Sequence, residues 1–361
     1  MNKMDELVNR TNTSDNKIHL VKVKSNIVKL SPNLETELKN KICNLSLKEQ
    51  MRLIKSEIEY QNFPFIEDQK IKKGKFLAKG SFGKVYAATY GEIDVALKEL
   101  EIDKVFKNIL SLLQEIQMSM LSFHERVPRF YGVFFRENDQ NKEHFICLVF
   151  DLVKGESLKD ISVKRYKDNL PLKLDALIQL VSIINDLHNE NIIHRDLKPE
   201  NIIVSDDDKV YLIDFGTSKV VSGKSTRTYD AKGTTIYMGP ENFELRDIEE
   251  NENGEENGGG DENDIDTRPI TISFSFDVWS LGCIISEICS GIQPWKNFPG
   301  KKGINEAVIM GFLMSKKDFP IPGTLEQPLK DLLMLVFNNE PDERIKTSVL
   351  LEKLKEYRGS L

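Results

Sequence analysis

The run HRDLKPEN, residues 194–201, combines an aspartate, a lysine and an asparagine at fixed offsets, and DFG follows at 214–216. These residue types could carry out phosphoryl transfer. The carboxylate of Asp196 could orient a hydroxyl, and the Lys198 cation could balance charge on the phosphate. The two remaining oxygen donors, of the kind that bind Mg²⁺, are Asn201 and Asp214. So many matches in order are improbable for an ordinary polar loop.

Together, the two motifs resemble the catalytic loop and the metal loop of eukaryotic protein kinases. The resemblance implies ATP and Mg²⁺ as cofactors. It also implies Asp196 and Lys198 as catalytic residues and Asn201 and Asp214 as metal ligands. We expect His194 to be structural, because no acid–base task is evident for it. The resemblance extends over residues 66–358.

A second motif, LAKGSFGKV at 77–85, follows a strand pattern. It resembles the kinase glycine-rich loop, in which glycine lets the main chain approach nucleotide phosphates closely. The nucleotide contacts implied by this resemblance are Leu77, Ala78, Lys79, Gly80, Ser81, Phe82, Gly83 and Val85. Ala78 stands where the family has its first glycine, which bears on loop flexibility and nucleotide affinity.

The run VALK at 95–98 resembles the strand that supplies the phosphate-binding lysine. Lys98 would then pair with Glu115 on the following helix. In that register Ser119 replaces a bulky apolar residue, so either the packing is loose or the register is off by one. The nucleotide contacts implied beyond Lys98 are Ala96, Asp151, Val153 and Ser157, and Phe150 would guard the back of the pocket.

Two later motifs indicate the type of kinase. Lys198-Pro199-Glu200 and the run GTTIYMGPE at 233–241 resemble serine/threonine kinases, and Thr234 would bond near Asp196 and Lys198. The resemblance pairs Glu241 with Arg344 and makes Asp277 a structural support of the catalytic loop. The runs at 130–133 and 155–158 are loosely similar to the tyrosine-kinase-like group of serine/threonine kinases.

The pattern of elements predicts an α+β, bilobal fold. Strands are expected at 71–77, 84–90, 93–99, 130–135 and 145–150, with one helix whose buried face carries Ile109, Leu112, Leu113, Ile116, Met120 and Phe123. This small lobe, 66–150, is joined by a hinge, 151–155, to a mostly helical large lobe, 156–358. The helices expected there cover 174–187, 278–290, 305–314, 325–337 and 347–357.

Bulk composition excludes several classes of protein. The chain has 361 residues and a net charge of −7, and 244–266 alone carry about −10, which leaves the rest near +3. The sequence lacks the basic stripe that would suggest nucleic-acid binding. No apolar run is long enough to span a membrane. The cysteines Cys43, Cys147, Cys283 and Cys289 lack paired or metal-type spacing, which favours a reducing cytoplasm.

Two segments have open roles. Residues 1–65 are polar, with one amphipathic helix expected at 45–60. They are either a flexible leader with a docked helix or a regulatory, partner-binding segment. The acidic run 244–266 is expected to be a disordered insertion between two helices of the large lobe. It is either a passive loop or a docking site for a basic partner.

The sequence therefore predicts an ATP-dependent protein serine/threonine kinase acting on Ser or Thr hydroxyls of protein substrates. The alternatives are a pseudokinase that acts as a scaffold and a dual-specificity enzyme. Hydroxyl residues crowd 217–235, and Arg195 could receive a phosphate on that loop. We expect an upstream kinase to activate the protein at Ser225, Thr226 or Thr228; a merely mobile loop is the alternative.

Overall fold

A computed structural model describes residues 31, 34, 45–79, 83–106, 109–121, 124–137, 144–221, 225–228, 233–243, 270–296 and 305–361. The backbone divides into two compact units. Unit 1 comprises Met1–Lys154 and Ile213–Gly216. Unit 2 comprises Gly155–Leu212 and Thr217–Leu361.

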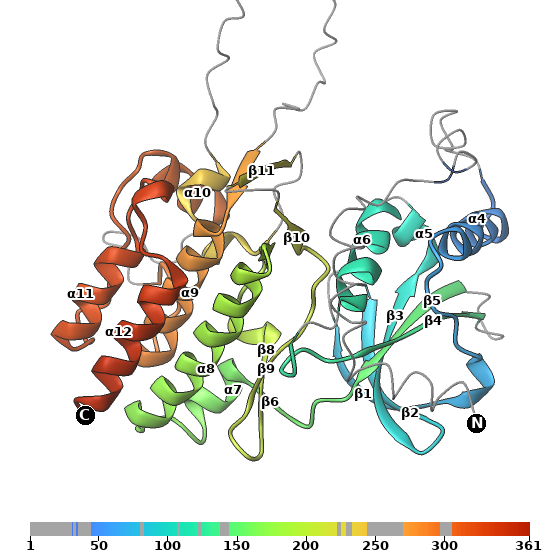
Figure 1. The fold of residues 1–361 in the computed structure, drawn as a ribbon, viewed down its shortest axis with the longest axis horizontal. Coiled ribbons are helices and arrows are strands. Elements are labelled where there is room, and N and C mark those ends of the chain that lie inside the picture. Colours follow the sequence, from blue (N-terminus) through green and yellow to red (C-terminus); the bar gives the residue numbers. More distant parts are fainter. Residues whose placement is uncertain are drawn as a thin grey trace, which may run out of the picture. The chain divides into compact units, whose positions relative to one another are not determined.

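Unit 1 is built on a five-stranded antiparallel sheet in the order β1-β2-β3-β5-β4 (Figure 1). Its strands are β1 Ile71–Lys79, β2 Gly83–Tyr90, β3 Ile93–Glu101, β4 Phe130–Glu137 and β5 His144–Asp151. All five predicted strands are present, each slightly longer than the sequence pattern suggested. The order puts β3, with Lys98, in the middle of the sheet.

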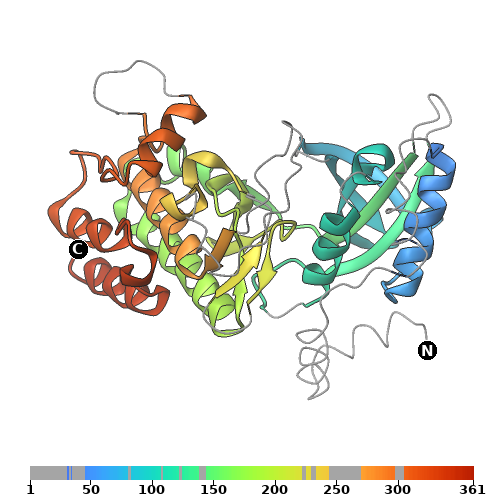
Figure 2. The same ribbon diagram turned by 90° about the horizontal axis from the view of Figure 1, so that it is seen from above.

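Alternate residues of β5 enter two apolar clusters, because successive side chains of a strand point to opposite faces. Ile146 and Leu148 join one cluster, and Cys147 and Val149 join the other. Among the described residues, the helices that accompany the sheet are α4 Leu47–Tyr60, α5 Ile102–Phe106 and α6 Ile109–Met120. Figure 2 shows α4, in blue, running beside the sheet of this unit.

Helix α4 matches the helix expected at 45–60. It starts with a capping box in which Ser46 and Glu49 bond each other's backbone amides. Helix α6 differs from expectation at one position. Met120 is 37% exposed, whereas Met118 is buried, because the helix presents its buried side over 109–119 and ends at 120. Phe123 lies outside the described residues.

Unit 2 is mostly helical. Its helices are α7 Leu158–Val163, α8 Leu170–Asn189, α9 Ser275–Ser290, α10 Glu306–Met314, α11 Gln327–Val336 and α12 Thr347–Gly359. Asn169 caps α8, and Gly291 ends α9 in the left-handed conformation that favours glycine. Trp279 on α9 is fully buried against the rings of Phe319 and Phe337. The five predicted helices of this part are all present.

Short elements of unit 2 shape its loops. The strands are β6 Gly155–Ser157, β7 Ile192–Ile193, β8 Ile202–Ser205, β9 Val210–Leu212, β10 Lys219–Val220, β11 Ser225–Thr228 and β12 Ile270–Ser273. They form the sheets β6-β8-β9, β7-β10 and β11-β12. Single 3₁₀ turns occur at Asp68–Lys70 in unit 1 and, in unit 2, at Pro199–Asn201, Thr235–Tyr237, Pro240–Asn242 and Pro341–Glu343.

The expected setting of the acidic insertion was wrong. The run 244–266 lies outside the described residues, but the first element after it is strand β12, not a helix. Antiparallel pairing joins β12 to β11, with Thr226 opposite Ile272. Ile272 is buried in a cluster with Ile193 and Val221. So short a strand depends on a partner far away in the sequence, which periodicity alone does not reveal.

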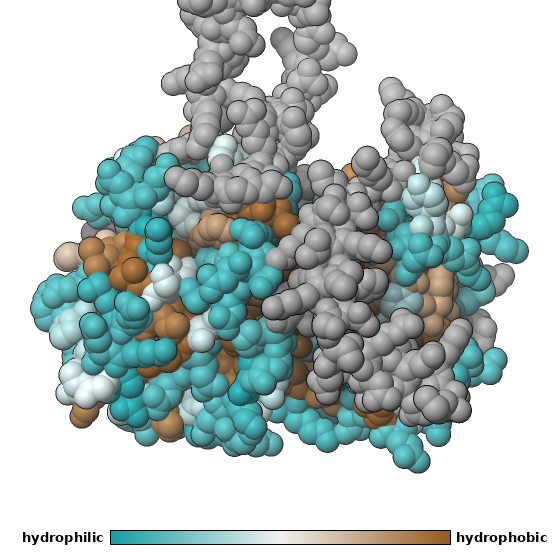
Figure 3. Space-filling view, viewed as in Figure 1, coloured by the Kyte–Doolittle hydropathy of each residue, from teal (hydrophilic) through white to brown (hydrophobic). Residues whose placement is uncertain are grey.

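On the face shown in Figure 3, the described residues are mostly hydrophilic, with smaller apolar areas among them. None of the helices in the described ranges has the length and hydrophobicity that a membrane span requires. The described cysteines Cys147, Cys283 and Cys289 are free thiols. Burial raises the pKa of Cys289 to about 12, so this thiol is a poor nucleophile.

Candidate active site

Unit 1 contains a three-residue ion cluster centred on Lys98. The Lys98 Nζ lies 2.5 Å from Oε1 of Glu115 on α6 and 3.2 Å from Oδ1 of Asp214. Strand pairing positions the lysine, because β3 is bonded on both sides, to β2 and to β5. The predicted Lys98–Glu115 pairing is present, so the helix register was correct. Ser119 in that register is a buried polar residue.

The electrostatics keep this lysine charged. Burial alone would lower the pKa of Lys98, but attraction to Asp214 and Glu115 outweighs it and raises the pKa well above its usual value. Asp214 has a left-handed backbone, with φ of 65°. At Gly216 an added Cβ would lie 3.2 Å from Glu115 Oε2 and 3.3 Å from Asp214 Oδ1. Glycine therefore leaves room for both carboxylates.

Several residues predicted to contact nucleotide lie on β1, β2 and β3. Leu77, Ala78 and Lys79 are exposed at the end of β1, and Val85 and Ala96 are half-buried. The fold itself requires glycine at position 83, because a Cβ there would lie 2.0 Å from the carbonyl oxygen of Glu99. The remaining three predicted contacts, Gly80, Ser81 and Phe82, lie outside the described residues.

At the end of β5, Asp151 uses its side chain within unit 1. Its carboxylate accepts from the Arg129 amide at 2.9 Å and the Tyr131 hydroxyl at 2.7 Å. Burial, and then this hydrogen bond, raise the pKa of Tyr131 to about 12. The Phe150 ring packs 5.2 Å from the Phe130 ring. The Asp151 backbone amide also donates to the Arg129 carbonyl at 2.9 Å, which leaves the Asp151 carbonyl oxygen as the candidate for recognising an adenine edge. Val153 follows in the half-buried connection after β5.

Unit 2 contains a second polar network, around Asp196. Lys198 Nζ donates to Asp196 Oδ2 at 2.6 Å and to Thr234 Oγ1 at 3.0 Å, and Thr234 donates to Asp196 Oδ1 at 2.8 Å. The Asn201 amide nitrogen donates to the Asp196 carbonyl at 2.9 Å. This bond uses the nitrogen end of the amide and leaves the oxygen end to act as an acceptor.

The loop that carries Asp196 is held by a buried carboxylate. Asp277 on α9 accepts from the backbone amides of His194 at 2.8 Å and Arg195 at 2.9 Å. His188 bridges Asp277 at 3.0 Å and Thr347 at 2.7 Å. Burial alone would raise the pKa of Asp277, but the bond to His188 and the neighbouring donors hold it below the usual value.

Comparison with known proteins decides the family. The profile of the protein kinase domain matches residues 71–354, most of the chain. The chain belongs to the protein kinase family. Mitogen-activated protein kinase kinase kinase A of Dictyostelium discoideum is 31% identical over 296 residues, covering 78% of this chain and 27% of that protein.

Other relatives are also named as kinases. Mitogen-activated protein kinase kinase kinase 5 of Arabidopsis thaliana is 28% identical over 306 residues, covering 82% of this chain and 38% of that protein. Aurora kinase of Saccharomyces cerevisiae is 25% identical over 277 residues, covering 76% of this chain and 65% of that protein. The chain spans roughly a quarter to two fifths of the length of the mitogen-activated protein kinase kinase kinases it matches.

Within the kinase domain, the predicted Glu241–Arg344 pair is present in unit 2. Arg344 Nη1 and Nη2 donate to the two Glu241 oxygens at 2.7 and 3.0 Å. The guanidinium also lies over the Trp279 ring, 5.0 Å from its centroid. A Cβ at Gly239 would lie 2.5 Å from Glu241 Oε2, so glycine at this position leaves room for the carboxylate.

The structure brings the predicted kinase residues together in two groups. Lys98, Glu115 and Asp214 form one in unit 1, and Asp196, Lys198, Asn201 and Thr234 form the other in unit 2. Ser157 instead caps helix α7, accepting from the Asp160 amide at 3.1 Å. Sequence reasoning missed His188, whose only signal is a histidine in the last turn of α8.

Proposed function

We propose that this chain is an ATP-dependent protein serine/threonine kinase. The observation that carries the proposal is the ion cluster in which Lys98 bonds Glu115 and Asp214. An isolated lysine so well buried would be costly, and two carboxylates from distant parts of the sequence hold it charged. Such a fixed cation suits the phosphate oxygens of a nucleotide, because it needs no reorganisation when charge develops on them.

The nucleotide is ATP in this proposal. The exposed Leu77 and half-buried Val85 and Ala96 offer apolar surface for an adenine ring, and Lys98 meets the phosphates. The family resemblance implies that backbone groups of Asp151 and Val153 bond the edge of the base, with Ser157 as a further contact. It also implies that the glycine-rich loop at 77–85, of which residues 80–82 lie outside the described residues, contacts the phosphates.

The metal would be Mg²⁺, and the family resemblance implies Asp214 and Asn201 as the residues that would hold it. The donor set fits a hard cation, because Asp214 has a carboxylate that is 43% exposed and Asn201 supplies an amide oxygen. When bound, Mg²⁺ neutralises charge on the phosphates. A cation bound to Asp214 would compete with Lys98 for this carboxylate, and the lysine would then be more available to phosphate.

Asp196 receives the protein substrate. Its Oδ1 and Oδ2 already accept bonds from Thr234 and Lys198, which fix the carboxylate in one orientation. A serine or threonine hydroxyl bonds this carboxylate and attacks the γ-phosphorus of ATP. The new O–P bond forms as the bond to the ADP oxygen breaks, and the hydroxyl proton passes towards Asp196. Lys198 stabilises the transferring phosphoryl group.

Several features favour serine or threonine over tyrosine as acceptor. The KPE run after Asp196 and the substrate loop 233–241 are of the serine/threonine type. Relatives are named as mitogen-activated protein kinase kinase kinases, so we expect protein substrates in a kinase cascade. The free thiols of the described cysteines favour a cytoplasmic location. Residues 66–358 act as the kinase domain. Phosphoamino-acid analysis of the product distinguishes a dual-specificity kinase, which also phosphorylates tyrosine, from a serine/threonine kinase.

Activation by phosphorylation is part of the proposal. Ser225, Thr226 and Thr228 lie on β11, whose backbone pairs with β12, so a phosphate added there acts on an ordered strand pair. An upstream kinase supplies the phosphate, and Arg195 is the proposed receiver. Alanine at all three positions should abolish activation. Full activity of that variant in a phosphate-free preparation would end this part of the proposal.

The central test is Mg-ATP turnover with a generic protein substrate. Asp214→Ala, Lys98→Met and Asp196→Asn should each lower kcat/KM by about 10² or more while the fold remains intact. Asp331→Ala, an exposed aspartate on α11, is the matched control and should leave turnover unchanged. No turnover by the wild type after treatment with an activating kinase would favour the pseudokinase alternative.

A further inference from the structure

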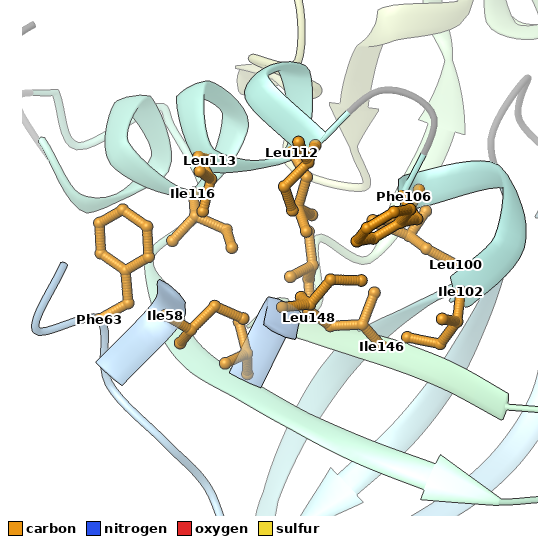
Figure 4. Packing of buried hydrophobic residues seen from close by; sticks show 14 of the residues in the cluster. Ile58, Phe63, Leu100, Ile102, Phe106, Leu112, Leu113, Ile116, Ile146 and Leu148 are labelled. Atoms are coloured by element: carbon orange, nitrogen blue, oxygen red, sulfur yellow. The ribbon is translucent and has the colours of Figure 1, made fainter. Parts of the chain in front are cut away.

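Helix α6 carries Glu115 and shares an apolar cluster with helix α4, which precedes the sheet. Ile54 and Ile58 on α4 are fully buried and share one apolar cluster with Phe63 and with Leu113 and Ile116 of α6. In Figure 4, Leu113 and Ile116 point from α6 towards Ile58 and Phe63. The packing that holds α6 therefore includes residues from the extension.

The extension is also anchored by a buried carboxylate. Glu57 on α4 is fully buried, and its oxygens accept from the Ser31 amide at 3.2 and 3.1 Å and from Gln61 Nε2 at 2.8 Å. Leu34 is 1% exposed and joins the same cluster. Burying a carboxylate costs free energy unless specific donors bond it, and a passive leader would not need such an arrangement. These contacts make α4 an integral part of unit 1.

The orientation of α6 about its axis controls the Lys98 ion pair. Glu115 and Ile116 are adjacent, so a rotation that relaxes the packing of Ile116 also moves the Glu115 carboxylate. A carboxylate about 6 Å from the helix axis moves by about 3 Å when the helix turns by roughly 30°. That displacement would break a bond whose length is 2.5 Å. A helix as short as α6 depends on tertiary packing for its position.

We propose that helix α4 with Phe63 is a built-in positioning element that holds α6 in the orientation in which Glu115 pairs with Lys98. Ile58 is fully buried in the cluster that α4 shares with α6 and is the residue chosen for the test. The inference rests on the proposed kinase function, in which that pair prepares Lys98 for phosphate. Ile58 is a positioning residue, since it acts through α6 and contacts no reacting atom.

The test compares two buried isoleucines in the full-length chain. Ile58→Ala removes packing from the cluster shared with α6. Ile71→Ala removes the same atoms from the cluster on the other face of the sheet and is the matched control. At a temperature where circular dichroism shows both folded, we expect kcat to fall at least about fivefold for Ile58→Ala and less than about twofold for Ile71→Ala. The conservative Ile58→Val should remain close to wild type.

A double-mutant cycle separates positioning from a general loss of stability. If Ile58 acts through Glu115, adding Ile58→Ala to Glu115→Gln should change kcat/KM little beyond the single Glu115→Gln variant. Losses that multiply in the double variant would overturn the proposal. Should Ile58→Ala fail to fold, Leu53→Ala on the same helix is used under the same criteria.

Amide hydrogen exchange gives a readout that needs no activity. We expect residues 109–120 to exchange faster in Ile58→Ala than in wild type and in Ile71→Ala, at equal protection of β5. Unchanged exchange in α6 would overturn the proposal. A wild type without turnover but with this exchange difference would refute the kinase function and leave α4 as a positioning element of α6.

Discussion

The buried pair between Glu241 and Arg344 provides the sharpest prediction about stability. The two side chains are 2% and 0% exposed. All five N–H groups of the guanidinium have acceptors, which are the Glu241 oxygens, the Ser275 carbonyl and, twice, the Asn338 carbonyl. Arg344→Met keeps an unbranched apolar stem but removes the cation and leaves the Glu241 charge buried alone.

The expected loss is large. Removing one partner of a buried ion pair costs about 3–5 kcal/mol, because the remaining charge is no longer compensated. That is a large share of the roughly 5–15 kcal/mol that holds a typical domain folded. The measurement is urea unfolding followed by circular dichroism, with the free energy of unfolding extrapolated to water.

The control is an exposed pair in the same unit. Lys316 and Glu340 lie 2.8 Å apart with side chains 45% and 57% exposed. Lys316→Met should cost less than about 1 kcal/mol, since water already screens that pair. The double variant Glu241→Gln with Arg344→Met should recover part of the loss, because no charge stays buried. An Arg344→Met variant no less stable than Lys316→Met would refute the reasoning.

Two further predictions concern the supports of unit 2. Asp277→Asn should lower the free energy of unfolding by about 1–3 kcal/mol. Because the folded-state pKa of Asp277 is lowered, the carboxylate stabilises the fold above about pH 4 and loses this effect as pH falls through the folded-state pKa. The difference in free energy of unfolding between wild type and Asp277→Asn should therefore shrink in acid-unfolding titrations. Gly282→Ala would place a Cβ 2.4 Å from Val336 Cγ1 and should cost about 1–3 kcal/mol by overpacking, read as a lower Tm. Gly311→Ala, where a Cβ meets nothing within 4 Å, is its control, and an equal Tm for the two variants would contradict the packing explanation.

Local patterns determined much of this protein. Strand alternation and helical periodicity predicted the five strands of unit 1 and the main helices of unit 2, because the burial of one face repeats at a fixed spacing along the sequence. The motifs around Asp196, Asp214 and Lys98 identified the reactive groups, since phosphoryl transfer requires those residue types at those offsets. The pairing of Lys98 with Glu115 followed once the helix register was set.

Contacts between distant residues that belong to no family motif were decided only by the tertiary structure. Strand β12 exists because β11 pairs with it, and Ile270–Ser273 is too short to be predicted from periodicity. His188 became a support because packing brings it against Asp277 and Thr347. The packing of α4 into the apolar cluster shared with α6 depends on side chains from separate segments of unit 1. Spacing along a chain specifies which face of an element is apolar, whereas the neighbour that covers this face is chosen when the whole unit packs.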